Sequence, residues 1–138
     1  MTDKLPNYWV VGATWGGKDD ALPRFLKRGY WYCFDVNECL ADDAGLGNSI
    51  SVQQERFREI KSGDRIAVKR LLGQGASEMD ILAIGVVKDV DDGEWRIYID
   101  WRFEFKKGER RVPLRGCTAS VHGPYQLDDA WVHQIFCI

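Results

Sequence analysis

The 138-residue sequence lacks several features that would assign it to a common class of protein. It contains no stretch of about 18 apolar residues, so we expect no membrane span. Its first residues, MTDKLPNYW, lack the apolar run of a signal peptide. None of its four cysteines forms a C-x-x-C pair. The sequence therefore predicts a cytoplasmic protein with reduced thiols.

Signals for metal binding and catalysis are also missing. The two histidines, His122 and His133, and the scattered cysteines do not have the spacing of a metal site, so no metal or other cofactor is expected. No G-x-S-x-G nucleophile motif and no G-x-x-x-x-G-K-[ST] phosphate loop occurs. The adjacent aspartates at 19/20, 42/43, 91/92 and 128/129 are more typical of turns and helix caps. We predict that the protein is not an enzyme.

The charge balance excludes broad, non-specific coating of nucleic acid. There are 19 Lys and Arg residues against 21 Asp and Glu residues, a formal net charge of −2. One local run, from Arg102 to Arg115, nevertheless contains six basic and two acidic residues. A charged surface that faces water explains such a run equally well. The alternative is phosphate binding, with these candidates: Arg70, Arg102, Lys106, Lys107, Arg110 and Arg111.

The sequence is unusually rich in tryptophan, with six residues. An indole ring stacks well on flat ligands, at a gain of about 1–3 kcal/mol for each nucleic-acid base. Trp15 follows a predicted strand, Trp31 follows a predicted helix, and Asp100 precedes Trp101 within one strand. Asp100 and the Thr14 hydroxyl are candidates for hydrogen bonds to a base edge. Burial in the core is the alternative for each tryptophan.

The periodicity and turn signals predict one α+β domain over residues 1–138. Predicted elements are a strand at 8–14, a helix at 21–29 capped by Asp19 or Asp20, a helix from Ser49 or Ser51 to Ile60, strands at 65–71, 80–90 and 94–105, an edge strand at 110–114 and a helix at 130–136. Residues 36–48 and 72–80 are predicted loops, and residues 91–93 a hairpin turn. This order suits a small antiparallel or mixed β-barrel flanked by two or three helices.

Alternation assigns side chains to faces of two strands. In the strand at 65–71, Ile66, Val68 and Arg70 are predicted to share one face, and Ala67 and Lys69 the other. In the strand at 94–105, one face is predicted to hold Trp95, Ile97, Ile99, Trp101, Phe103 and Phe105.

The order of motifs resembles a known family. YWVVGATWGGKDD, PRFLKRGYW, IKSGDRIAVK, ILAIGVV and a strand carrying IDW follow one another over about residues 8–105. This order resembles the N-terminal domain of McrB-like restriction ATPases and, more distantly, EVE domains of the PUA-like superfamily. The resemblance implies a PUA-like barrel whose pocket receives a flipped-out, often modified base. Carried over by position, it implies a pocket of Ala13, Thr14, Trp15, Trp31, Lys69, Asp100 and Trp101, with Arg70 beside it.

Three functions stay open from these observations. The resemblance favours a reader of modified DNA that works with restriction or defence proteins. The same fold could bind RNA. A protein-interaction or inhibitor module is the third, for which the acidic segment at 38–43 would be suited.

Overall fold

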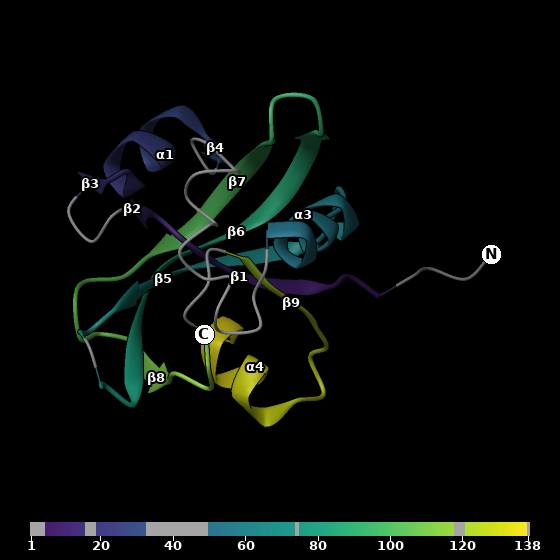
Figure 1. Cartoon of the computed structure of the whole chain (residues 1–138). Coiled ribbons are helices and arrows are strands. Elements are labelled where there is room, and N and C mark those ends of the chain that lie inside the picture. The colour runs from purple at the N-terminus through teal and green to yellow at the C-terminus, as the bar shows by residue number, and fades with distance from the viewer. Residues whose placement is uncertain (1–4, 16–18, 33–49, 74, 118–120, 138) are drawn as a thin grey trace.

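The computed structural model describes residues 5–15, 19–32, 50–73, 75–117 and 121–137 (Figure 1). The fold is α+β, as predicted: a curled mixed sheet forms a half-barrel, and three helices of the described residues pack against it. The elements are β1 (Tyr8–Gly12), β2 (Thr14–Trp15), β3 (Asp19–Asp20), α1 (Leu22–Arg28), β4 (Tyr30–Tyr32), α3 (Ile50–Glu59), β5 (Arg65–Leu71), β6 (Glu78–Asp91), β7 (Arg96–Glu104), β8 (Arg111–Pro113), β9 (Val121–Tyr125) and α4 (Ala130–Phe136).

The main sheet has the strand order β4-β7-β6-β5-β1-β9, and β8 pairs with β6. β1 and β5 are parallel, whereas the other neighbours in this sheet are antiparallel. A parallel pair needs a long crossover connection. Here that connection carries α1, β4 and α3, which explains why the predicted helices come early in the chain. β2 and β3 form a separate two-stranded sheet.

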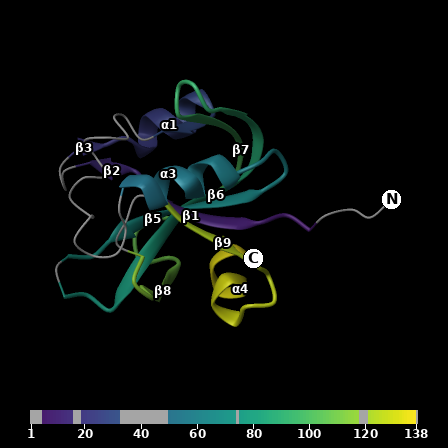
Figure 2. The ribbon, with the colours of Figure 1, turned by 45° about the vertical axis from the view of Figure 1, so that its right-hand side comes forward.

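The sheet separates two hydrophobic cores. The first core lies under α1 and α3, and the second lies under α4 (Figure 2). β1 supplies both cores, since Trp9 and Val11 face the first while Tyr8 and Val10 face the second. A strand buried on both faces reads as a continuous apolar run, as YWVVG does.

The buried carboxylate of Asp64 ties the start of β1 to the turn before β5. It accepts hydrogen bonds from the Trp9 indole N–H at 2.9 Å, the Asn7 amide at 3.1 Å and the Lys61 amide at 3.0 Å. These bonds satisfy the indole of Trp9, which is fully buried. The Gly63-Asp64 turn therefore fixes where the two parallel strands begin.

The predicted helices are confirmed. α1 ends at Gly29, which adopts a left-handed φ of 73° and donates its amide to the Phe25 carbonyl. The prediction that Asp19 or Asp20 caps its start was wrong, since the N-cap is Ala21, although the Asp20 carboxylate accepts the Leu22 amide at 3.1 Å. α4 has Asp129 as its N-cap, with the carboxylate accepting the Trp131 amide at 2.9 Å.

The predicted hairpin between β6 and β7 is confirmed. The prediction that one face of β7 holds every second residue from Trp95 to Phe105 was wrong. Ile97, Ile99 and Trp101 do face the first core. Phe103 pairs with Ile84, which belongs to the second core, and Phe105 packs against that core as well. The register shifts between these two regions, because Ile84 pairs with Phe103 whereas Gly85 pairs with Trp101. This β-bulge inserts Arg102 as an extra residue and reverses the alternation beyond it.

Besides the short strands β3 and β4, the sequence did not predict β9. β9 contains Gly123 and Pro124, joined by a cis peptide bond, and both residue types are rare in strands. Pro124 is tolerated because β9 pairs only with β1 in the described sheet and so lies at its edge. Residues 33–49, which include the predicted loop at 36–48, lie outside the described residues.

Candidate functional site

The parallel strands β1 and β5 end side by side, with Gly12 in register with Lys69. The Trp31 indole N–H donates to the Gly12 carbonyl at 2.8 Å. The Ala21 amide donates to the Ala13 carbonyl, also at 2.8 Å. Three residues predicted to line a base pocket, namely Ala13, Trp31 and Lys69, are thus brought to the same end of the sheet.

Lys69 lies on the face predicted for it, with Ala67 and toward the second core. Its side chain is buried at 5% exposure. His122, which pairs with Val10 on β1, faces the same core and is also buried. A basic side chain therefore shares a largely enclosed space with an imidazole ring.

This environment keeps His122 uncharged. Burial is the main cause that lowers the pKa of His122 to about 3, and the positive charges of Lys69 and Arg56 lower it further. At neutral pH the ring is therefore a neutral imidazole, with one nitrogen that donates and one that accepts a hydrogen bond.

α3 closes the site along β9. The Arg56 guanidinium donates to the Val121 carbonyl at 2.8 Å, and the Gln53 side-chain oxygen accepts the Val121 amide at 3.4 Å. The polar side chain of Gln53 is fully buried. Neither contact could be predicted from local sequence patterns, because both reach β9, a strand that these patterns do not indicate.

Trp31 lies on the other face of the sheet from Lys69, inside the first core. Its side chain has 0% exposure, and its ring stacks on Phe57 of α3 with centroids 6.2 Å apart. The indole N–H is already used by the Gly12 carbonyl. In this structure Trp31 therefore positions the end of β1, and its ring is covered.

Asp100 and Trp101 lie on β7. The Trp101 indole N–H donates to the Phe25 carbonyl at 2.9 Å, which holds the half-buried ring against the end of α1. Asp100 is exposed and forms a 2.9 Å ion pair with Arg102. Trp101 therefore packs against the first core, which also contains Ala13 and Trp31, whereas Asp100 lies at the surface.

Thr14 and Trp15 directly follow the end of β1. Their backbone forms β2, with Thr14 in register with Asp20 and Trp15 with Asp19. This short hairpin leads from the candidate site into α1.

The candidate phosphate-binding residues are mostly engaged within the protein. Arg70 pairs with Asp20 at 3.4 Å, Arg102 with Asp100 at 2.9 Å and Arg111 with Asp80 at 2.9 Å, while Arg110 donates to the Ile135 carbonyl at 2.9 Å. Lys106 and Lys107 are exposed. The arginines of the basic run therefore largely make contacts within the protein, although Arg102, Arg111 and Arg115 keep exposed side chains.

Asp80 shows how firmly one of these pairs is held. Its carboxylate is buried and also accepts the Gly108 amide at 3.2 Å. The hydrogen bond from Arg111 is the main cause that lowers the pKa of Asp80, against the opposing effect of burial. Arg111 thereby joins β8 to β6 rather than facing a ligand.

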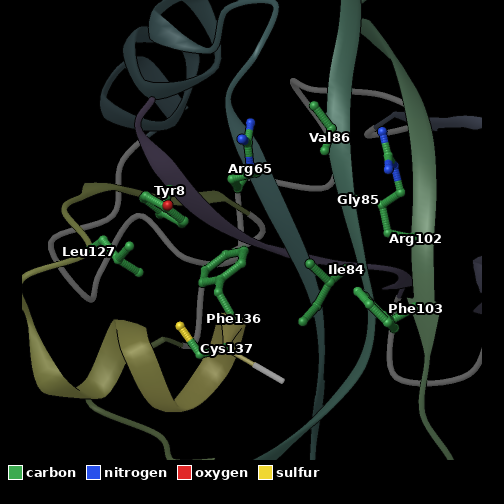
Figure 3. Close-up of a pocket in the computed structure, with 10 residues that line it drawn as sticks. All are labelled: Tyr8, Arg65, Ile84, Gly85, Val86, Arg102, Phe103, Leu127, Phe136 and Cys137. Carbon is green, nitrogen blue, oxygen red and sulfur yellow. The ribbon is translucent and has the colours of Figure 1, made fainter. Parts of the chain in front are cut away.

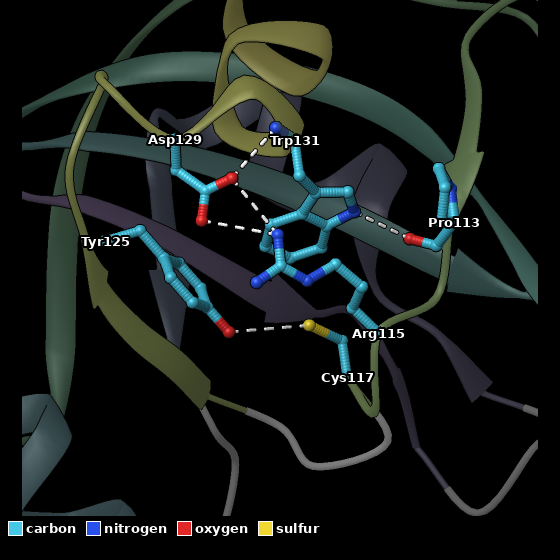
Figure 4. Close-up of polar contacts among 6 residues, drawn as sticks. All are labelled: Pro113, Arg115, Cys117, Tyr125, Asp129 and Trp131. Carbon is cyan, nitrogen blue, oxygen red and sulfur yellow. Dashed lines mark hydrogen bonds and ion pairs between the residues drawn. The ribbon is translucent and has the colours of Figure 1, made fainter.

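A second polar network, which the sequence did not predict, surrounds α4 (Figure 4). Arg115 pairs with Asp129 at 3.1 Å and lies over the Trp131 ring, and the Trp131 indole donates to the Pro113 carbonyl at 2.8 Å. Nearby, the Cys117 Sγ atom and the Tyr125 hydroxyl oxygen are 3.7 Å apart. Burial raises the pKa of the Cys117 thiol, so this cysteine is a poor nucleophile.

The described residues contain no group of three or more His, Cys, Asp or Glu side chains that could hold a metal ion. In the same part of the chain, no helix is long and apolar enough to cross a membrane. Neither the models of known protein families nor the curated proteins contain a match to the sequence.

Proposed function

We propose that this chain is a PUA-like reader of nucleic acid that accepts one extruded, modified base at the ends of β1 and β5. DNA in a restriction or defence setting is the proposed ligand. The observation that carries the proposal is the hydrogen bond from the Trp31 indole to the Gly12 carbonyl, beside Lys69. It joins three segments, far apart in the sequence, that the motif resemblance assigns to a base pocket.

The groups at this site suit a base edge. The Lys69 ammonium is a hydrogen-bond donor to base oxygen or nitrogen acceptors, and a neutral His122 ring can both donate and accept. On the opposite face of the sheet, Trp31 stacks on Phe57 and supports the end of β1 from within the first core. Extruding a base costs a few kcal/mol, which stacking and edge contacts must offset.

The paired arginines imply that binding depends on the base more than on the phosphate backbone. If the arginines keep their ion pairs and only Lys106 and Lys107 contact phosphates, about two phosphate contacts are expected. The logarithm of the binding constant should then fall with the logarithm of salt concentration with a slope of about −2. A reader that relies on base contacts would keep its selectivity as salt rises.

A fluorescence anisotropy titration tests this function. The probes are one short duplex carrying cytosine, 5-methylcytosine, 5-hydroxymethylcytosine or N6-methyladenine, together with matched RNA, at fixed salt. We expect at least about tenfold tighter binding of one modified probe, equivalent to about 1.4 kcal/mol. Lys69→Met should abolish this preference, whereas Lys107→Met, the matched removal of an exposed charge, should keep it.

Circular dichroism and thermal unfolding of Lys69→Met establish that the variant is folded before it is titrated. Equal affinity for all DNA probes, lost as salt rises, would contradict base reading. A preference for the RNA probe would indicate that the ligand of this site is RNA and not DNA. Absence of binding to every probe would instead favour the protein-interaction function.

A further inference from the structure

A separate pocket opens at the opposite end of β1 and β5 (Figure 3). It has a volume of about 180 Å³ and lies between α4 and the strands β5, β6 and β7. Its apolar lining includes the aromatic rings of Tyr8, Phe103 and Phe136. Tyr8 and Phe136 pack edge to face with centroids 4.9 Å apart, so this wall is preformed.

The β-bulge in β7 builds one side of this pocket. Neighbouring residues of a regular strand point to opposite faces, yet Arg102 and Phe103 both line the pocket. The bulge makes this possible because Arg102 is the extra residue between the pairs Ile84–Phe103 and Gly85–Trp101. Bulges often re-aim a side chain next to a functional site.

Gly85, which pairs with Trp101 of β7, allows β6 and β7 to lie close together. A Cβ atom at this position would lie 2.4 Å from the Ile99 Cγ2 atom and 2.9 Å from the Asp100 carbonyl oxygen. The absence of a side chain thus lets β7 approach β6 where the bulge begins. The geometry that exposes Arg102 and Phe103 therefore depends on a glycine.

Two guanidinium groups flank the pocket at one end. Arg65 on β5 is in register with Val86 on β6, and Arg102 lies on the other side of Val86 (Figure 3). Arg65 donates to the Gly63 carbonyl, and Arg102 pairs with Asp100. Each guanidinium has five N–H donors, so both can still bind an anion. The pocket lining contains no acidic residue.

The size of the pocket restricts its ligand. Sites for drug-sized molecules usually exceed about 300 Å³, whereas an apolar cavity of about 150 Å³ can hold benzene. A volume of 180 Å³ therefore fits one ring with a short substituent. The guanidinium fork matches a carboxylate in shape and charge.

We propose that this pocket, formed by Tyr8, Ile84, Phe103 and Phe136 with Arg65 and Arg102 at its edge, binds a small aromatic acid. The ring packs among the apolar side chains, and the carboxylate accepts hydrogen bonds from the two arginines. The site is distinct from the candidate base site. Tyr8 and Gly12 are four residues apart along β1, which corresponds to about 13 Å in a strand.

Titration of the full chain by isothermal calorimetry or NMR tests this assignment with three probes. Phenylacetate carries both the ring and the charge, phenylacetamide lacks the charge, and acetate lacks the ring. For a ligand of ten heavy atoms, we expect phenylacetate to bind with a dissociation constant of about 1 mM or lower. Its affinity should exceed that of either other probe by at least about tenfold.

Arg102→Gln and Arg65→Gln should each remove most of the preference for the acid over the amide. Lys107→Gln removes a charge of the same basic run outside the pocket and should leave that preference unchanged. Equal affinity for acid and amide, an unchanged preference in both arginine variants, or no saturable phenylacetate binding up to about 10 mM would overturn the proposal. None of these results depends on whether nucleic acid binds, so the two proposals fail separately.

Discussion

The two ends of the β1–β5 pair differ in how their polar groups are used. At the C-terminal ends of these strands, Lys69 and His122 are buried, and the Trp31 indole donates to a backbone carbonyl. At their starts, a bulge leaves Phe103 46% exposed and turns Arg102 toward an open pocket. The same sheet therefore carries one enclosed polar site and one accessible apolar site.

This difference shows that a residue type alone does not identify a binding residue. A tryptophan is a favourable stacking residue, yet Trp9, Trp31 and Trp131 are buried and each donates its indole N–H within the protein. The ring of Phe103 is more accessible, although alternation predicted that it shares one face of β7 with Ile97, Ile99 and Trp101. Backbone geometry decides which ring is accessible.

Trp31→Ala is expected to cause the largest loss of stability among the variants that compare the two ends. Removing a fully buried indole that stacks on Phe57 should lower the free energy of unfolding by about 3–5 kcal/mol. Urea denaturation followed by circular dichroism measures the change. A loss below about 1 kcal/mol would show that Trp31 is not part of the core and is instead available to a ligand.

Gly85→Ala tests the backbone approach behind the bulge. Because its Cβ atom would lie 2.4 Å from the Ile99 side chain, the variant should lose about 1–3 kcal/mol of stability. Gly93→Ala is the matched control in the same hairpin, since the nearest atom to its Cβ is 3.4 Å away, and it should cost less than about 0.5 kcal/mol. Equal losses in urea denaturation would contradict a special role for Gly85.

His122 makes the enclosed end sensitive to pH. Its pKa is about 3 in the folded protein, below the ordinary 6.5, so between these values the unfolded chain binds the extra proton. Stability should therefore fall as pH drops below 6.5, by about 1 kcal/mol between pH 7.5 and 5.5.

Urea denaturation at these two pH values compares His122→Gln with His133→Gln. The first variant should lose this pH dependence, whereas the second, which changes an exposed ring on α4, should keep it. The same pH dependence in both variants and the wild type would show that His122 is not the group responsible.

Phe103→Ala should have the smallest effect on stability. Its ring is nearly half exposed, so the loss should stay below about 1 kcal/mol in thermal or urea unfolding. Phenylacetate should nevertheless bind at least about fivefold more weakly, since the ring forms one wall of the pocket. A large loss of stability with unchanged phenylacetate affinity would assign Phe103 to the core after all.

Much of the fold could be predicted from sequence periodicity and caps. The helix that ends at Gly29, the alternation of Ile66, Ala67 and Val68, and the turn at Asp91 are local signals, and the structure confirms them. The bulge at Arg102 and the edge strand with Pro124 depend on pairing with distant strands. Local patterns carry no information on such pairing, which is why these features were missed.

The candidate sites were predictable to a smaller extent. Motif order brought Ala13, Trp31 and Lys69 into one prediction, and the structure places them at the same end of the sheet, with Ala13 and Trp31 in the first core and Lys69 toward the second. Trp101 packs against the first core and donates to the Phe25 carbonyl of α1, whereas Asp100 pairs with Arg102 at the surface. The charges of the 102–115 run could be counted, but their pairing with distant partners such as Asp80 could not.

Two titrations of ¹⁵N-labelled protein, followed by amide NMR shifts, test most directly whether the two ends bind different ligands. One uses the duplex probe with the preferred modified base, and the other uses phenylacetate. We predict that the duplex shifts the amides of Gly12 and Lys69, whereas phenylacetate shifts those of Arg102 and Phe103. Duplex-induced shifts at Arg102 and Phe103, with Gly12 and Lys69 unchanged, would contradict the account.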